Sequence, residues 1–245
     1  MAKRELKLGY LYPKLLSIYG DYGNVLILKK RCEWRNIELT VNEINIGDSL
    51  SENDLYFVGG GQDLQQIAVS DDLQRNKSFL HDEMNKNAVF LAICGGYQLL
   101  GKYYQPHEGE RLEGISLLDI YTVAGNKRFI GNVTTKLSDN IDLPLKTLVG
   151  FENHSGLTYL DGDTKPISTV ITGNGNNGKD KTEGARYKNV FGTYLHGPFL
   201  SKNPHFADYL IQLALYKKYG NSEKIETLDD KEEVSAHTAL INKKY

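Results

Sequence analysis

Cys94 stands where an apolar run meets a pair of glycines. Residues 88–93 read Ala-Val-Phe-Leu-Ala-Ile, Gly95 and Gly96 follow the cysteine, and apolar residues then recur with helical spacing. This order predicts a buried strand, a tight turn and a helix, with the cysteine at the corner. The start of a helix lowers the pKa of a nearby cysteine, and the thiolate is the nucleophilic form. The pattern therefore favours Cys94 as a nucleophile over an inert core cysteine.

Histidine is the side chain best suited to take a proton from a cysteine near neutral pH and return it to a leaving group. His196 ends the apolar stretch 191–195 and precedes a Gly-Pro turn, so it is predicted to lie at the end of a strand. From there it can reach Cys94, which favours it as the base over His154. The other histidines are expected to face solvent: His81, His107, His205 and His237.

Two further features could serve a substrate. The glycines at 59–61 follow a predicted strand and could offer a backbone N–H to an oxyanion, as Gly95 could beside the cysteine. Arg128 could grip a substrate carboxylate through a bidentate fork, but its spacing gives it no priority over Arg111 or Arg186. No group of His, Cys and acidic residues has the spacing of a metal site.

Predicted strands alternate with predicted helices in the first part of the chain. The strands fall at 6–12, 39–46, 55–58 and 88–93. The spacing of Val25, Leu28 and Cys32 predicts a helix with Cys32 on its buried face, and a polar helix is expected at 78–86. This alternation predicts an α/β fold with a largely parallel sheet, in which the glycines and Cys94 lie beyond the carboxyl ends of the strands.

The second half of the chain is predicted to be richer in β structure. Short strands are expected at 115–123, 129–136, 148–151, 167–172 and 189–195. A helix is expected at 204–219, with Gly220 as its stop. Residues 1–220 are therefore predicted to form a single domain, and 221–245 a charged C-terminal tail that forms a surface or docking helix.

The composition limits the classes of function. A chain of 245 residues with 40% hydrophobic content can bury a full core, and a net charge of −2 offers no basic surface for a nucleic acid. No run approaches the ~18 apolar residues of a membrane span, and the first seven residues lead into no signal-peptide core. Cys32 and Cys94 are expected to be free thiols in a reducing cytoplasm.

Residues 173–179 imitate a phosphate-binding loop. Asp180, however, stands where a Ser or Thr would ligate magnesium, and residues 181–184 carry no apolar helix face. An Asn/Gly-rich loop is favoured over a nucleotide site. No cofactor is therefore expected in this chain.

Four segments together resemble one family. They are Tyr19–Asn24, Ile93–Gln98, Gly150–His154 and Gly192–Pro198. The Cys-Gly-Gly-Tyr-Gln element at 94–98 resembles the nucleophile elbow of class I glutamine amidotransferases. The whole set is similar to the cobyric-acid-synthase-like branch of that family, which implies a flavodoxin-like fold.

The resemblance also implies roles, residue by residue. It makes Cys94 the nucleophile, His196 the base, Arg128 and Gln98 substrate-binding residues, and Gly60 and Gly95 oxyanion donors. Position 198 is proline where many class I enzymes carry the acid that orients the histidine. The orienting acid is therefore expected either from Glu152 or, as we favour, from a partner protein.

The implied function is glutamine hydrolysis that supplies ammonia to a partner. In this reading a MurT-like, Mur-ligase-like subunit forms a heterodimer with the chain, binds ATP and magnesium, and amidates the D-glutamate of the lipid II stem peptide to D-isoglutamine. The complex would act in the cytoplasm near the inner face of the membrane, without inserting into it, in peptidoglycan synthesis.

Three alternatives remain. The chain could be the glutaminase subunit of another cobyric-acid-synthase-like amidotransferase. It could be a free-standing cysteine hydrolase, although such enzymes usually have a histidine where Gly95 stands. A non-enzymatic subunit is disfavoured because both Cys94 and His196 are present.

Overall fold

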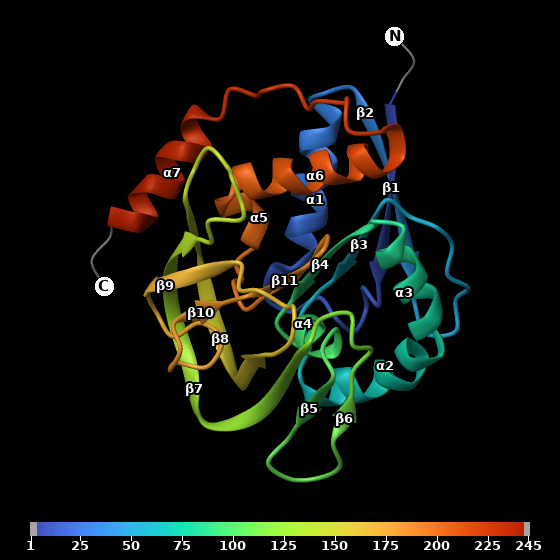
Figure 1. The fold of residues 1–245 in the computed structure, drawn as a ribbon, viewed down its shortest axis with the longest axis vertical. Coiled ribbons are helices and arrows are strands. Elements are labelled where there is room, and N and C mark those ends of the chain that lie inside the picture. The colour runs from blue at the N-terminus through green and yellow to red at the C-terminus, as the bar shows by residue number, and fades with distance from the viewer. Residues whose placement is uncertain (1–3, 243–245) are drawn as a thin grey trace.

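Two β-sheets organise the chain in the computed structural model, which describes residues 4–242 (Figure 1). The first sheet has the order β11-β12-β4-β3-β1-β2 and is parallel except for β11, which pairs antiparallel with β12. In that order its strands are Ala185–Tyr187, Val190–Thr193, Val89–Ile93, Leu55–Val58, Arg4–Leu11 and Ile37–Ile44. The expected α/β fold with a largely parallel sheet is confirmed.

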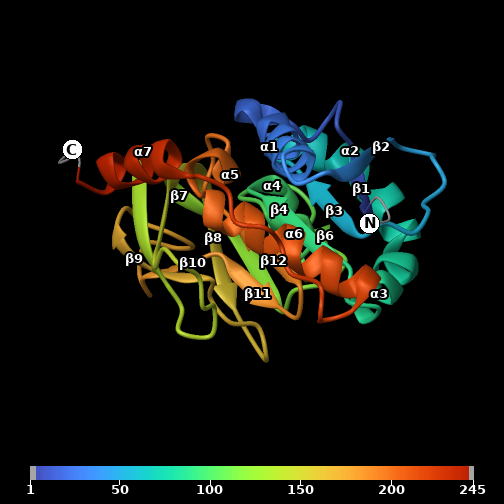
Figure 2. The same cartoon turned by 90° about the horizontal axis from the view of Figure 1, so that it is seen from above.

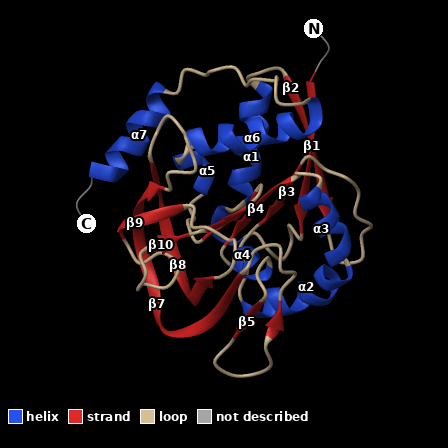
Figure 3. Ribbon diagram, in the orientation of Figure 1, coloured by secondary structure: helices blue, strands red, loops and turns tan. Residues whose placement is uncertain are grey.

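Helices cover this sheet on both sides, which explains why its central strands read as continuous apolar runs. Every residue of β3, β4 and β12 is buried. The helix α1 (Tyr22–Glu33) contacts α5 (Phe199–Lys202) and α6 (Pro204–Tyr219), and α2 (Asp63–Arg75) contacts α3 (Lys77–Asn85) and α4 (Gly95–Leu99). Figure 3 shows these two groups of helices in different parts of the molecule.

The second sheet is built from the long antiparallel pair β7 (Ile120–Leu137) and β8 (Thr147–Leu160). Four shorter strands extend it on the β7 side: β9 (Ser168–Thr172), β10 (Thr182–Glu183), β5 (Tyr103–Gln105) and β6 (Leu112–Glu113). Backbone hydrogen bonds in both directions join Phe151 of β8 to His196, just after β12. The second sheet is thereby fastened beside the carboxyl edge of the first (Figure 2).

The main differences from the sequence-based prediction lie in this second sheet and in α2. The strands predicted at 115–123 and 129–136 are wrong as separate elements, because β7 is one strand whose pairing is irregular between Ala124 and Phe129. The strand predicted at 148–151 extends to Leu160. The helix α2 was not predicted, since Val69 and Leu73 are the only apolar residues on its buried face.

The tail contains a helix, α7 (Lys231–Asn242), and buried contacts hold this region against the rest of the chain. His237 pairs through Nε2 with Thr147 Oγ1 at 2.8 Å and through Nδ1 with the Lys202 carbonyl oxygen at 2.7 Å. Its ring meets His205 edge to face. The expectation that His205 and His237 face solvent is wrong, because α7 packs over α5 and β8 and buries both rings.

Within residues 4–242, no helix is both long enough and apolar enough to cross a bilayer.

Candidate active site

Cys94 occupies a sharp corner between β4 and α4, as its flanking sequence predicts. Its backbone lies at φ 50° and ψ −106°, in the positive-φ region that costs free energy for a residue with a side chain. A Cβ atom on Gly95 would lie 2.6 Å from the Gly61 oxygen, and one on Gly96 would lie 2.6 Å from the Gly59 oxygen. Only glycine allows this close approach, so the glycine run after β3 and the elbow after β4 are packed backbone to backbone.

Four neighbouring parallel strands deliver the polar groups of the site to one edge. Gly60 follows β3, Cys94 follows β4, and His196 lies three residues after β12. Asp21 comes at the end of the segment that leads from β1 to α1. These strands are adjacent in the order β12-β4-β3-β1, so residues far apart in the sequence meet beyond their carboxyl ends.

His196 is buried between Cys94 and an aspartate. Its Nδ1 lies 3.6 Å from Oδ1 of Asp21, and both side chains are almost fully enclosed. Burial by itself lowers the pKa of His196, but the facing Asp21 and Cys94 side chains outweigh it and raise the pKa to about 9. The imidazole is therefore stabilised in its protonated form at neutral pH.

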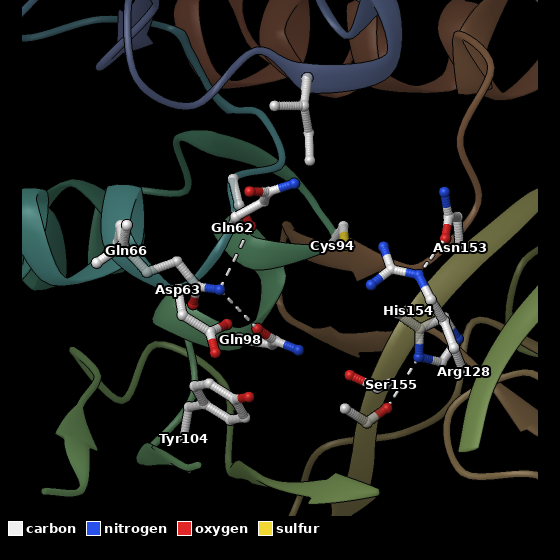
Figure 4. A pocket seen from close by; sticks show the side chains of 14 residues that line it. Gln62, Asp63, Gln66, Cys94, Gln98, Tyr104, Arg128, Asn153, His154 and Ser155 are labelled. Atoms are coloured by element: carbon white, nitrogen blue, oxygen red, sulfur yellow. Dashed lines mark hydrogen bonds between the residues drawn. The ribbon is translucent and has the colours of Figure 1, made fainter. Parts of the chain in front are cut away.

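A cavity of about 380 Å³ opens in front of Cys94 (Figure 4). Gln98, Arg128 and His154 line it together with the cysteine. Asp63, at the start of α2, also lines it. The cavity thus brings together a thiol, a cationic fork and an acidic group, a combination suited to a small zwitterionic substrate.

Arg128 is the arginine that reaches this cavity. Its Nε donates to Oδ1 of Asn153 on the neighbouring strand at 2.6 Å, and its guanidinium points toward Cys94 (Figure 4). The two alternatives are held elsewhere: Arg111 pairs with Glu113, and Arg186 donates to the Lys188 carbonyl oxygen.

Gln98 lines the cavity at the centre of a buried hydrogen-bond network. Its Oε1 accepts from Gln66 Nε2, and its Nε2 donates to the hydroxyl of Tyr194, each at 3.0 Å. The Tyr194 ring in turn stacks on His154 at 3.6 Å between ring centroids. Burial lowers the pKa of His154 to about 4, so this ring is uncharged at neutral pH.

Glu152 and Gly60 were predicted to act at the site, but in the structure their polar groups are hydrogen-bonded to other residues. The Glu152 carboxylate accepts from the backbone and side-chain amides of Asn174 and from the Gly175 N–H, and so holds the Asn/Gly-rich loop at 173–178. The Gly60 N–H donates to Asp21 Oδ2 at 2.6 Å and is therefore engaged in this conformation. Of the glycines at 59–61, Gly61 lines the cavity.

Asp21 is the residue of the site that sequence reasoning missed. It lies within the Tyr19–Asn24 segment, but an aspartate just before a helix normally indicates an N-cap. Here its side chain makes no capping bond to α1. The absence of such a bond is visible only in three dimensions.

Residues 7–204 match the family described as the CobB/CobQ-like glutamine amidotransferase domain. This chain belongs to that family. Cys94, Arg128 and His196 of the amidotransferase all lie within the matched region.

Alignments with two curated relatives extend over most of the amidotransferase. The chain is 42% identical to the Streptococcus pneumoniae lipid II isoglutaminyl synthase (glutamine-hydrolyzing) subunit GatD, over 92% of this chain and 86% of the relative. It is 40% identical to the Staphylococcus aureus protein of the same name, over 98% and 96%. A cobyric acid synthase from Thermoanaerobacter is 31% identical, over 77% of this chain but 39% of the relative.

Solved structures support the fold of the amidotransferase. PurLQS from Thermotoga maritima superposes with a TM-score of 0.57 at 13% identity, over 98% of this chain and 100% of that one. A glutamine amidotransferase from the same organism gives 0.54 at 16% identity, over 96% and 90%. At these identities the likeness concerns the fold alone.

Among the described residues, no three His, Cys, Asp or Glu side chains are grouped so that they could hold a metal ion.

Proposed function

We propose that this chain is the glutamine-hydrolysing subunit of a lipid II isoglutaminyl synthase. The observation that carries the proposal is one cavity holding an elbow cysteine, lined by an arginine, with a buried histidine beside the cysteine. The two GatD relatives, similar over nearly the whole chain, support the substrate and the pathway.

The chemistry assigned to the site begins with the side-chain amide of glutamine. Cys94 passes its proton to His196, and the resulting thiolate attacks the amide carbon. The C–N bond then breaks as His196 gives that proton to the departing nitrogen. Ammonia leaves and a glutamyl thioester remains on the sulfur. His196 next takes a proton from water, whose oxygen attacks the thioester and releases glutamate and the thiol.

The substrate is held by its charged end. Arg128 binds the glutamine α-carboxylate through its guanidinium, a pairing that is stronger and more directional than a neutral hydrogen bond. Gln98, tied to Gln66 and Tyr194, stays in place as a wall of the pocket. Gly95 donates its N–H to the oxyanion. The Gly60 N–H could do so only after leaving Asp21.

The ammonia serves a partner. A MurT-like subunit with ATP and magnesium activates the D-glutamate carboxylate of the lipid II stem peptide and receives the ammonia. Ammonia released into water at neutral pH is mostly ammonium, which is not a nucleophile, so transfer needs a sheltered path. We therefore place the chain in a heteromer that acts in the cytoplasm at the inner face of the membrane.

The test compares nitrogen sources in the reconstituted complex. Wild-type complex should amidate lipid II with glutamine faster than with an equal concentration of ammonium salt. Cys94→Ser should abolish glutamine hydrolysis while ammonium still supports amidation, because serine lacks the easily formed anion of a thiol. Near-normal glutaminase activity in Cys94→Ser would refute the role of the cysteine, and equal rates from the two nitrogen sources would refute the sheltered path.

A further inference from the structure

The cavity in front of Cys94 is lined by one positively charged and one negatively charged side chain. Among the described residues that line it, Arg128 is the only lysine or arginine and Asp63 the only carboxylate. His154 also lines it and is uncharged near pH 7. The proposed function uses Arg128 for the α-carboxylate of glutamine, but the same guanidinium repels the α-ammonium on that carbon. A site for glutamine therefore needs a separate contact for the ammonium, and Asp63 carries the opposite charge.

Tyr104 of β5 holds the carboxylate of Asp63. Both residues line the cavity, and Figure 4 shows the Asp63 side chain next to the Tyr104 ring. Burial, the negative charge of Asp63 and a hydrogen bond to its carboxylate raise the pKa of Tyr104 to about 12. The hydroxyl therefore keeps its proton near pH 7 and donates a hydrogen bond to Asp63. An ionised carboxylate accepts about four hydrogen bonds, so lone pairs remain for a second donor.

Gln66 adds an unpaired acceptor one helical turn after Asp63. Its side chain is buried and lines the same cavity, and residues three apart in α2 lie on the same side of the helix. Its Nε2 donates to the Gly61 carbonyl oxygen at 3.4 Å and to Gln98 Oε1 at 3.0 Å. Within residues 4–242, its Oε1 is buried and has no hydrogen-bond partner. Leaving a buried acceptor unpaired costs free energy, which a bound N–H donor would recover.

We propose that Asp63 and Gln66 form the subsite that binds the α-ammonium of the substrate, with Tyr104 as the positioning residue for Asp63. This inference rests on the proposed function, in which glutamine lies with its side-chain amide at Cys94 and its carboxylate at Arg128. An ammonium has N–H donors and no acceptor, which matches a carboxylate beside an unpaired carbonyl oxygen. The site is thereby specific for the amide of an α-amino acid over a simple carboxamide that lacks the amine.

Three contacts on one carbon also set the handedness of the substrate. The carboxylate, the ammonium and the side chain each meet a different group of the protein, so exchanging the ammonium with the α-hydrogen moves it away from Asp63. A site built to pair with a polar group rejects a ligand that leaves its own groups unpaired. L-Glutamine should therefore be hydrolysed much faster than D-glutamine, and neutralising Asp63 should narrow that difference.

A carboxylate in the first turn of a helix can also serve the fold alone. Asp63 is the first residue of α2, where the helix dipole favours a negative charge. If its role were only structural, substitution would lower stability and leave the preference for the amine unchanged. The ratio of kcat/KM for glutamine to that for an analogue without the amine therefore distinguishes the two roles.

The experiment measures kcat/KM for L-glutamine and for 4-carbamoylbutanoate, which is glutamine without its α-amino group, with the chain alone and in its complex. The wild type should prefer glutamine. Asp63→Asn should lower kcat/KM for glutamine by roughly 10- to 100-fold, mainly through KM, because it removes a charge-assisted contact. It should not lower the value for 4-carbamoylbutanoate, so the preference should collapse. A preserved preference in Asp63→Asn would overturn the proposal.

Two further variants test the placement of the subsite. Asp71→Asn removes an exposed carboxylate of the same helix that does not line the cavity, and it should change the kinetics of neither substrate. The same loss of preference in this control would mean that the ratio follows the overall charge of α2, which would overturn the role of Asp63. Tyr104→Phe keeps the ring and should reduce the preference by a smaller factor than Asp63→Asn. An unchanged preference would overturn the positioning role of Tyr104.

Protection of Cys94 from alkylation by iodoacetamide tests binding without turnover. L-Glutamate should protect the wild type at lower concentration than glutarate, which lacks the amine, and Asp63→Asn should remove that difference. Equal protection by the two acids in the wild type would overturn the proposal. Because Asp63 is exposed, its substitution should leave the fold intact. A chain that distinguishes the two acids in this way but hydrolyses no glutamine would refute the proposed function and support the subsite.

Discussion

Arg128 donates from Nε to Oδ1 of Asn153 over 2.6 Å, across the pairing of β7 with β8. The contact restrains an exposed side chain and helps to set the direction of its guanidinium at the cavity wall. A side chain that is already ordered loses less entropy when it binds a substrate carboxylate.

Arg128→Ala should therefore weaken the use of glutamine by about 1.5–3 kcal/mol in kcat/KM, through loss of a charge-assisted contact. Arg128→Lys should also be impaired, because lysine cannot form the fork. Asn153→Ala should raise KM by a smaller factor, with kcat nearly unchanged. Steady-state kinetics on the three variants checks this, and wild-type constants for Arg128→Ala would send the search back to Arg111 and Arg186.

The raised pKa of His196 predicts how stability depends on pH. The folded chain holds the proton more tightly than the unfolded chain, whose histidine has a pKa near its ordinary value of 6.5. The contribution is fully present below about pH 6.5 and is lost as the pH rises through about 9. Over that window the wild type should lose up to about 1.4 kcal/mol per pH unit relative to His196→Gln. Urea unfolding of both proteins at pH 6 and pH 9.5 measures the difference, and parallel curves would contradict it.

Glu152→Gln tests whether Glu152, one candidate from the sequence analysis, is the acid that orients His196. The carboxylate accepts from Asn174 and Gly175, so the substitution should loosen the loop at 173–178 and speed amide exchange there. It should leave the pH profile of Cys94 alkylation by iodoacetamide in place. Comparing kcat/KM for glutamine in the isolated chain and in the complex completes the test. Loss of activity together with a shifted profile would mean that Glu152 orients His196 after all.

The ion pair between Asp230 and Arg31 is expected to stabilise the packing of the tail against the rest of the chain. Both oxygens of Asp230 accept from the guanidinium of Arg31, at 2.9 and 2.7 Å, and the Arg31 side chain is almost fully buried. Asp230→Ala should lower the free energy of unfolding by about 1.5–3 kcal/mol, because it removes charge-assisted bonds to a buried cation. Limited proteolysis should then cut between Gly220 and α7 sooner than in the wild type. Asp229→Ala, at an exposed neighbour, is the control that should change neither.

The sequence was sufficient to predict those elements whose formation depends on neighbouring residues. The apolar run before Cys94 and the two glycines after it determined the strand, the elbow and the start of the helix. The helix α6 was predicted at its observed bounds because its apolar spacing, its first-turn proline and Gly220 all agree. Alternation of strands and helices was enough to predict a parallel sheet and to place Cys94 at its carboxyl edge.

Tertiary structure determined which charged groups face one another. Asp21, Gly60 and His196 lie far apart along the chain and meet because β1, β3 and β12 end at the same edge, and no spacing in the sequence records that. In the same way, the sequence could name Arg128, Arg111 and Arg186 only as equals, and the pairing of β7 with β8 brought the first of them to the cavity. Side-chain direction depends on long-range packing. The sequence alone therefore determined the strand, the corner and the place of Cys94 in it, while the fold alone turned the carboxylate of Asp21 away from its own helix and toward His196.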